Sequence, residues 1–122
     1  MTEQKSADRL DFEALRRAIE QSDFDSLMKF YAENAELYSV NRITPPSSPE
    51  VLRGKEAIAE RLEDVCCREM THRVEDEVVG QDRIAFNEAC EYPEGYKVLA
   101  AQTLEVRDGK IVRQVNVEAW DE

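Results

Sequence analysis

The residues best suited to chemistry lie near the end of the sequence. Polar and apolar side chains alternate up to Trp120, so a β-strand would present one mostly polar row, Gln114, Asn116, Glu118 and Trp120. Glu118 is the candidate general acid or base of this row, because a carboxyl group between apolar walls can exchange protons with a bound molecule. We therefore predict that Glu118 is catalytic and that Asn116 and Trp120 contact the substrate.

The same alternation allows the opposite orientation. Val115, Val117 and Ala119 form the apolar side of this run, and if that side faces the interior, Glu118 is a solvated surface residue. Both orientations stay open at this point. Whether Glu118 or Val117 faces the interior decides between them.

His72 is the only histidine of the chain and the one side chain that titrates near neutral pH without help. It begins an alternating run in phase with Val74 and Val78. We predict that His72 is catalytic and exchanges protons with a bound carbonyl or hydroxyl group, opposite Glu118. The alternative is a polar residue at a strand end.

A second alternating run places Glu88 and Cys90 on one face with Phe86 and Tyr92. We predict that Phe86, Glu88 and Cys90 contact the substrate. A buried Glu88 would need a partner, for which the candidates are His72, Arg113 and Glu118. The alternative is a small buried cysteine beside a solvated glutamate.

Further hydrogen-bonding groups complete the predicted site. Tyr38, Ser39 and Gln102 could bond to a ligand, and Val98, Ala100 and Leu104 share the phase of Gln102 as an apolar lining. A mostly apolar pocket with a few convergent polar groups is typical of small-molecule sites. We expect the ligand to be a hydrophobic small molecule.

Several classes of site are not expected. One histidine cannot form the usual histidine clusters, and Cys66 and Cys67 would point about 100° apart on a helix, so no metal site is predicted. The four glycines are isolated and form no phosphate-binding loop, and no cofactor is predicted. The net charge of −11 argues against nucleic acids and anionic membranes.

The 122 residues suffice for one domain, predicted as residues 9–122 after a flexible segment 1–8. No apolar run is long enough to span a membrane. The first residues lack the apolar core of a signal peptide, so we expect a cytoplasmic protein whose three cysteines are thiols.

The pattern predicts helices first and strands later. Asp108-Gly109 favours a type I′ turn in a closing hairpin, and the proline-rich segment 44–49 is a loop that could be a lid or a plain connector. The expected elements are a helix from Ser6 to about residue 21, a helix capped by Asp23 and ending at Asn34, a strand over 35–40, a helix over 54–67, and four antiparallel strands over 71–79, 83–92, 96–107 and 110–120. This is an α+β plan with helices covering one face of a curled sheet.

Three segments in this order resemble the NTF2-like superfamily, most closely its SnoaL-like branch: Asp25 to Ala35 before the first strand, Arg53 to Ile58 at the third helix, and Arg107 to Ile111 in the last hairpin. The resemblance implies a cone of curved sheet, cystatin-like in plan, with a pocket at its wide end and a homodimer packed on the outer sheet face. The branch includes ketosteroid isomerases, polyketide cyclases, limonene epoxide hydrolases, dehydratases and non-catalytic binding modules.

The catalytic residues of these relatives carry over poorly. A ketosteroid isomerase would have a tyrosine and two acids where this sequence has Leu15, Ser39 and Gln102. A limonene-epoxide-hydrolase-like site matches Glu88, Cys90 and Glu118, of which only the last keeps the expected carboxylate.

The resemblance implies a cofactor-free isomerase, cyclase or dehydratase acting by proton transfer on a lipophilic carbonyl compound. The alternative is a non-catalytic module that binds a ligand or dimerises. A weaker third hypothesis is a protein whose acidic face binds a basic partner.

Overall fold

The computed structural model describes residues 9–121. The segment 1–8 and the expected helix start at Ser6 lie outside the described residues. In chain order the elements are α2 (Phe12–Glu20), α3 (Phe24–Met28), β1 (Tyr31–Val40), β2 (Glu50–Arg53), α4 (Lys55–Cys66), β3 (Thr71–Val79), β4 (Arg83–Glu91), β5 (Lys97–Arg107) and β6 (Lys110–Trp120).

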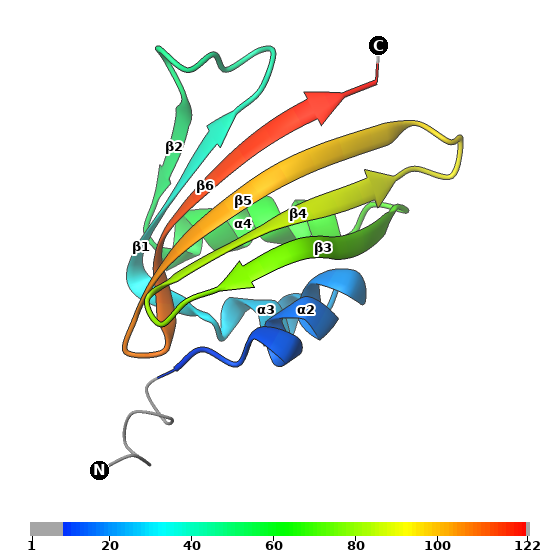
Figure 1. Cartoon of the computed structure of the whole chain (residues 1–122). Helices are drawn as coiled ribbons and strands as arrows, with labels where there is room; N and C mark the ends of the chain where they lie inside the picture. Colours follow the sequence, from blue (N-terminus) through cyan, green and yellow to red (C-terminus); the bar gives the residue numbers. More distant parts are fainter. Residues whose placement is uncertain (1–8, 122) are drawn as a thin grey trace.

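The strands form one curved sheet in the order β2-β1-β6-β5-β4-β3. The helices lie on one side of this sheet (Figure 1). The α+β prediction is confirmed, but the sheet is open and mixed, because β1 runs parallel to β6. The strand β2 was not expected. It pairs with β1 in an antiparallel hairpin around the proline-rich loop, so that loop is a hairpin connection.

Both N-terminal helices are shorter than the sequence suggested. α2 begins at Phe12, where the side chain of Asp11 accepts a hydrogen bond from the amide of Ala14. Asp23 caps α3 as expected, but α3 ends at Met28. The amphipathic spacing that extended this helix to Asn34 is overridden by the sheet, where β1 begins by pairing with β6.

The closing hairpin follows the prediction closely. Asp108 and Gly109 both have positive φ, 53° and 76°, as a type I′ turn requires. β5 and β6 then pair along their length, with Gln102 opposite Asn116 and Ala100 opposite Glu118. This register fixes which polar side chains of the two strands are neighbours.

The core lies between the sheet and the helices, with α2 packed against β3 and α4 against β1. Leu15, Ile58, Leu104 and Ile111 are its largest fully buried side chains. β3 is irregular at Asp76, which has a positive φ of 58°. Val78 therefore loses the phase it was expected to share with His72 and is exposed. None of the helices within residues 9–121 has the length and apolar character that a membrane crossing requires.

Candidate functional site

A cavity of about 140 Å³ lies between the inner face of the sheet and helices α2 and α4. Glu118 lines it, whereas Val117 is 45% exposed on the opposite face of β6. The polar row of the last strand therefore faces the cavity, and the orientation that the sequence left open is resolved in favour of Glu118.

Every predicted site residue except Tyr38 lines this cavity. Ser39 faces inward and is buried, but Tyr38 is its neighbour on β1 and points to the outer face. There the Tyr38 hydroxyl donates to Glu36 over 3.0 Å, and the Arg113 guanidinium lies 4.6 Å from the ring centroid. This placement corrects the expectation for Tyr38, because adjacent strand residues cannot both face the same pocket.

The carboxylate of Glu118 accepts hydrogen bonds from three side chains. The amide of Asn116 donates over 2.9 Å, the indole N–H of Trp120 over 3.1 Å, and the amide of Asn41 over 3.4 Å. Asn41 lies just after β1, where its side-chain carbonyl oxygen accepts from the backbone N–H groups of Ile43 and Thr44, at the start of the proline-rich loop. Glu118 is thus oriented by donors from its own strand and from a structured turn.

A directed chain of side-chain hydrogen bonds leads to Glu118. The Tyr31 hydroxyl donates to Gln114, the Gln114 amide donates to Gln102 over 2.8 Å, and the Gln102 amide donates to Asn116 over 2.9 Å. Asn116 then donates to Glu118. Each amide uses its carbonyl oxygen as acceptor and its N–H as donor, so the chain fixes the orientation of every amide in it.

Tyr31 begins this chain from a buried position. Burial, and then the nearby charge of Glu88, raise the pKa of the Tyr31 hydroxyl well above its ordinary value. The hydroxyl therefore stays protonated and remains a donor. The sequence placed Tyr31 in a helix and missed this role, which depends on β1 pairing with β6.

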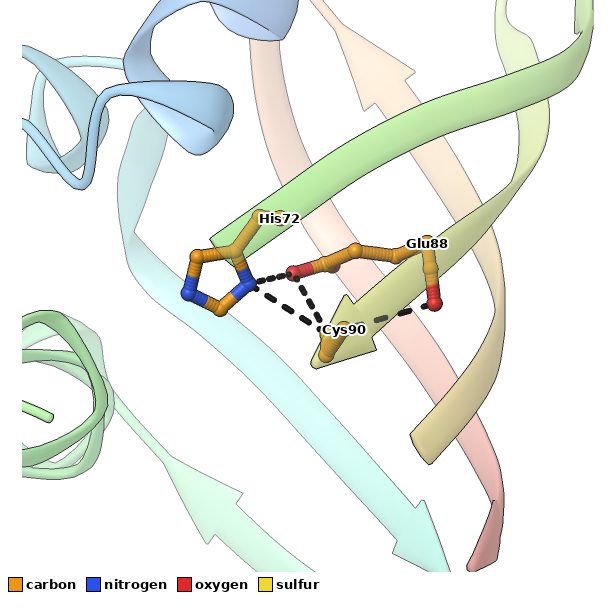
Figure 2. A group of neighbouring side chains, drawn as sticks. All are labelled: His72, Glu88 and Cys90. Atoms are coloured by element: carbon orange, nitrogen blue, oxygen red, sulfur yellow. Dashed lines mark hydrogen bonds and ion pairs between the residues drawn. The ribbon is translucent and has the colours of Figure 1, made fainter. Parts of the chain in front are cut away.

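His72, Glu88 and Cys90 form a compact cluster elsewhere in the cavity (Figure 2). The Nδ1 atom of His72 lies 2.9 Å from Oε2 of Glu88 and 3.3 Å from Sγ of Cys90, and the sulfur lies 3.7 Å from the same carboxylate oxygen. The other carboxylate oxygen accepts from Gln102 over 3.3 Å. Among the partners considered for Glu88, the structure thus selects His72.

The cluster does not have the arrangement of an activated cysteine nucleophile. Burial, with a further contribution from the charge of Glu88, raises the pKa of the Cys90 thiol to about 12. Glu88 and Cys90 also approach the same nitrogen of His72. In an activated pair, one ring nitrogen of the histidine would contact the nucleophile and the other would contact the orienting carboxylate.

Two arginines of the cavity were not anticipated from the sequence. Arg61 lines it from the middle of α4, and Arg68 lines it from the segment between α4 and β3. Arg61 is paired with Glu50 over 2.5 Å, and Arg68 with Asp64 over 2.6 Å. Arg61 follows Ile58 by three residues and so lies on the buried side of the helix, a signal the sequence did contain.

The positions matched to isomerase catalytic residues do face the cavity. Leu15, Ser39 and Gln102 all line it. None of these side chains can supply the phenol or carboxylic acid of a ketosteroid isomerase. The carboxylates of the inner sheet face are instead Glu88 and Glu118.

Comparison with solved structures identifies the same fold. An NTF2-like protein of unknown function from Mesorhizobium loti aligns with a TM-score of 0.78 and 17% identity, over 96% of this chain and 92% of the other. A Kribbella flavida protein provisionally designated a ketosteroid isomerase aligns with a TM-score of 0.74 and 15% identity, over 98% and 79%. A Silicibacter pomeroyi protein with a cystatin-like fold aligns with a TM-score of 0.71 and 14% identity, over 88% and 72%.

A search of curated proteins gave no significant match. The family comparison is informative, because the model of the SnoaL-like domain matches residues 12–114, which is most of the sequence. The chain therefore belongs to the SnoaL-like domain family, and it shares its fold with NTF2-like proteins.

Proposed function

We propose that this protein binds a small, mostly apolar carbonyl compound in its cavity and transfers a proton on it through Glu118, as an isomerase, cyclase or dehydratase without a redox cofactor. One observation carries the proposal: the carboxylate of Glu118 lines the cavity and is held in place by Asn116, Trp120 and Asn41. A base held in position by hydrogen bonds meets the geometric requirement for general acid-base catalysis.

The size of the cavity limits the ligand. Its volume is about 140 Å³. Pockets for drug-sized ligands are typically about 300–1,000 Å³, whereas a cavity of about 150 Å³ accommodates a benzene ring. The proposed ligand is therefore a monocyclic or short acyclic compound rather than a steroid-sized one.

Proton transfer is assigned to Glu118 rather than to a Glu118–His72 pair. The Nδ1 atom of His72 is engaged by Glu88 and Cys90, and Glu118 is engaged by other residues. Gln102 and Asn116 act as orienting groups, because their amides are already fixed by the hydrogen-bond chain.

The test uses Trp120, the only tryptophan in the chain, as a reporter. Its indole lines the cavity, so small cyclic and acyclic ketones can be screened by the change in its fluorescence. Compounds that bind are then incubated in D₂O, and exchange of the hydrogens next to the carbonyl is followed by NMR. We expect catalysed exchange in the wild-type protein and a loss of about 10²–10⁴-fold in Glu118→Gln.

The matched control is Glu105→Gln, which removes a carboxylate from β5 outside the cavity lining. It should exchange at the wild-type rate. If Glu118→Gln bound the ketone and exchanged it as fast as the wild type, Glu118 would not be the base.

A non-catalytic binding module is the second candidate. The observation in its favour is the set of cavity-facing positions without acid groups, Leu15, Ser39 and Gln102. The same experiment separates the two candidates, because a binding module would change Trp120 fluorescence without any catalysed exchange.

We also propose a homodimer through the outer face of the sheet. Leu99 and Val117 are about half exposed there, and their cross-strand partners are Ala119 and Ala101. This apolar patch supports face-to-face packing of two sheets. Val117→Lys should shift a dimer to monomer in light scattering at micromolar concentration. Ile43→Lys, an equally apolar but loop-borne control, should not. A monomeric wild-type protein would contradict the proposal.

A further inference from the structure

Three different metal-ligand types meet in the cluster of His72, Glu88 and Cys90. Their closest ligand atoms are an imidazole nitrogen, a carboxylate oxygen and a thiol sulfur, separated by 2.9, 3.3 and 3.7 Å. Zinc bonds of about 2.0 Å to nitrogen and oxygen and about 2.3 Å to sulfur place tetrahedral ligand atoms about 3.3–3.6 Å apart. The three atoms thus lie close to the spacing that one tetrahedral ion imposes.

The backbone holds these ligands in place. His72 and Cys90 are directly opposite each other on the paired strands β3 and β4, and Glu88 lies two residues before Cys90 on the same face. Figure 2 shows the three side chains converging from these two strands. Sites supported by paired strands keep their ligands close to the required geometry.

Glu88 has a hydrogen-bond partner outside the three proposed ligands, as metal-binding carboxylates usually have. While Oε2 faces His72 and Cys90, Oε1 accepts a hydrogen bond from Gln102 over 3.3 Å. Such partners orient ligands and tune affinity for the ion. Gln102 is itself fixed by Gln114 and Asn116.

The charge around the cluster favours a cation. The Glu88 side chain is only 15% exposed, and among residues 9–121 its one ion-pair partner is His72. The arginines that line the cavity are paired with Glu50 and Asp64 instead. A carboxylate this far from water requires compensation by hydrogen bonds or positive charge, which a divalent ion would supply.

We propose that His72 Nδ1, Glu88 Oε2 and Cys90 Sγ bind one divalent transition-metal ion, with Zn²⁺ the best match. Imidazole and thiolate favour Zn²⁺ over Mg²⁺ and Ca²⁺, which prefer oxygen ligands. The sequence argument against metals counted histidines and did not consider this mixed ligand set.

The proposed ion has a path to solvent and an open position. His72 and Cys90 also border a wider hollow of about 700 Å³ at the ends of β3 to β6. All three ligands line the cavity as well, so a fourth ligand would come from water or from a bound molecule. If the carbonyl compound proposed above binds, which is a separate hypothesis, its oxygen could take this position.

The test measures metal binding without any organic ligand. Full-length protein is freed of metals with a chelator, and Zn²⁺ binding is followed by calorimetry. Binding of Co²⁺ is followed by absorption, since a cobalt–thiolate bond gives a charge-transfer band in the near ultraviolet. We expect one equivalent of each ion. Cys90→Ser should abolish the charge-transfer band, and Cys90→Ser and Glu88→Gln should each weaken Zn²⁺ binding by at least about 100-fold, more than typical losses for an outer contact.

Two cysteine controls guard against adventitious binding. Cys67→Ser removes an exposed thiol and Cys66→Ser a partly buried one near the cavity, and both should retain the site. Circular dichroism and thermal unfolding would establish that each variant is folded.

The proposal is overturned if the wild-type protein binds no Zn²⁺, or if folded Cys90→Ser and Glu88→Gln bind it as tightly as the wild type. It is also overturned if binding is lost only in the Cys66 or Cys67 variant. These outcomes leave proton transfer by Glu118 intact, because that reaction is measured in a separate experiment that compares the wild type with Glu118→Gln.

Discussion

Two carboxylates occupy the same cavity in contrasting surroundings. Glu118 on β6 accepts hydrogen bonds from amide and indole N–H groups. Glu88 on β4 lies between a histidine and a thiol, with one amide donor at its far oxygen. Fixed neutral donors suit a base that must stay in position, whereas imidazole and sulfur suit the binding of a metal ion.

Gln102 connects the two surroundings. Its amide donates both to Glu88 and to Asn116, and Asn116 donates to Glu118. The strand order explains this position, because β5 lies between β4 and β6. The chemistry of each carboxylate therefore depends on the side chains that surround it more than on its own residue type. Variants of these neighbours can alter one carboxylate or both.

The largest effect on stability is expected from Gln102→Leu, which removes the connection. Loss of this buried amide leaves Gln114 without its acceptor and Glu88 and Asn116 without a donor. We expect the free energy of unfolding to fall by about 2–4 kcal/mol, since each unpaired buried group costs about 1–3 kcal/mol and relaxation recovers part of it. Urea titration measures this. The neighbouring exposed Thr103→Val is the control, and an equal effect in both would show that the network is not the cause.

Tyr31→Phe tests the start of the chain and should cost about 1–2 kcal/mol, because the carbonyl oxygen of Gln114 loses its donor. Tyr96→Phe is the control. The Tyr96 hydroxyl bonds to the Asp121 carbonyl at an exposed site, so its loss should cost less than about 0.5 kcal/mol.

The stability contribution of Tyr31 should also depend on pH. Burial raises the pKa of its hydroxyl in the folded protein, so the folded chain keeps a proton that the unfolded chain releases. The contribution is complete below the ordinary pKa of 10.0 and is lost as the pH rises beyond it. Urea titrations between pH 8 and about pH 11 should show that the free energy of unfolding declines less steeply with pH in Tyr31→Phe than in the wild type. Parallel declines would contradict this assignment.

Trp120→Phe should alter the surroundings of Glu118 but not those of Glu88. It removes the indole donor to Glu118 while keeping an aromatic ring beside Tyr92 and Tyr96. We expect the free energy of unfolding to be about 0.5–1.5 kcal/mol lower than in the wild type. Zn²⁺ affinity should be unchanged, because the indole N–H of Trp120 donates to Glu118 and to none of the three proposed ligands. A tenfold loss of Zn²⁺ affinity would mean that the two surroundings are coupled.

The smallest effect is expected from Glu50→Gln, which frees Arg61 near Glu118. Both side chains are about one-third exposed, so their ion pair should contribute only about 0.2–1 kcal/mol. The hydrogen bond from Arg61 lowers the pKa of Glu50, so this stability is present above the ordinary pKa of 4.5 and is lost as the pH falls below it. Wild-type and variant urea midpoints should therefore differ above pH 4.5 and converge as the pH falls below it. A constant difference would exclude the ion pair as its source.

Local sequence patterns predicted the parts of the fold that depend on neighbouring residues. The alternation of β4, β5 and β6 and the Asp108-Gly109 turn were correct, because side-chain period and turn conformation are local properties. The long form of the second helix was wrong, because residues from Tyr31 onward have helical spacing but pair with a strand some 80 residues later in the chain.

The candidate site shows the same division. Strand alternation predicted which residues share a face with Glu118, Glu88 and Gln102, but it did not decide whether Glu118 or Val117 faces the cavity. Their partners do not, because contact between His72 and Glu88 depends on the register of β3 against β4. The short strand β2 escaped notice since four residues between a proline loop and a helix carry little periodic signal.

The position of β6 has a consequence for how the chain folds. Lying between β1 and β5, it is the only link in the described sheet between the β1–β2 hairpin and the β3–β5 meander. During synthesis from the N-terminus both parts emerge earlier and expose unpaired strand edges, which favour association between chains. β6 pairs with β5 through the local Asp108-Gly109 hairpin, whereas its pairing with β1 joins residues some 80 positions apart, which is a slow type of step. Pairing of the last strand thus both completes the sheet and places Glu118 in the cavity.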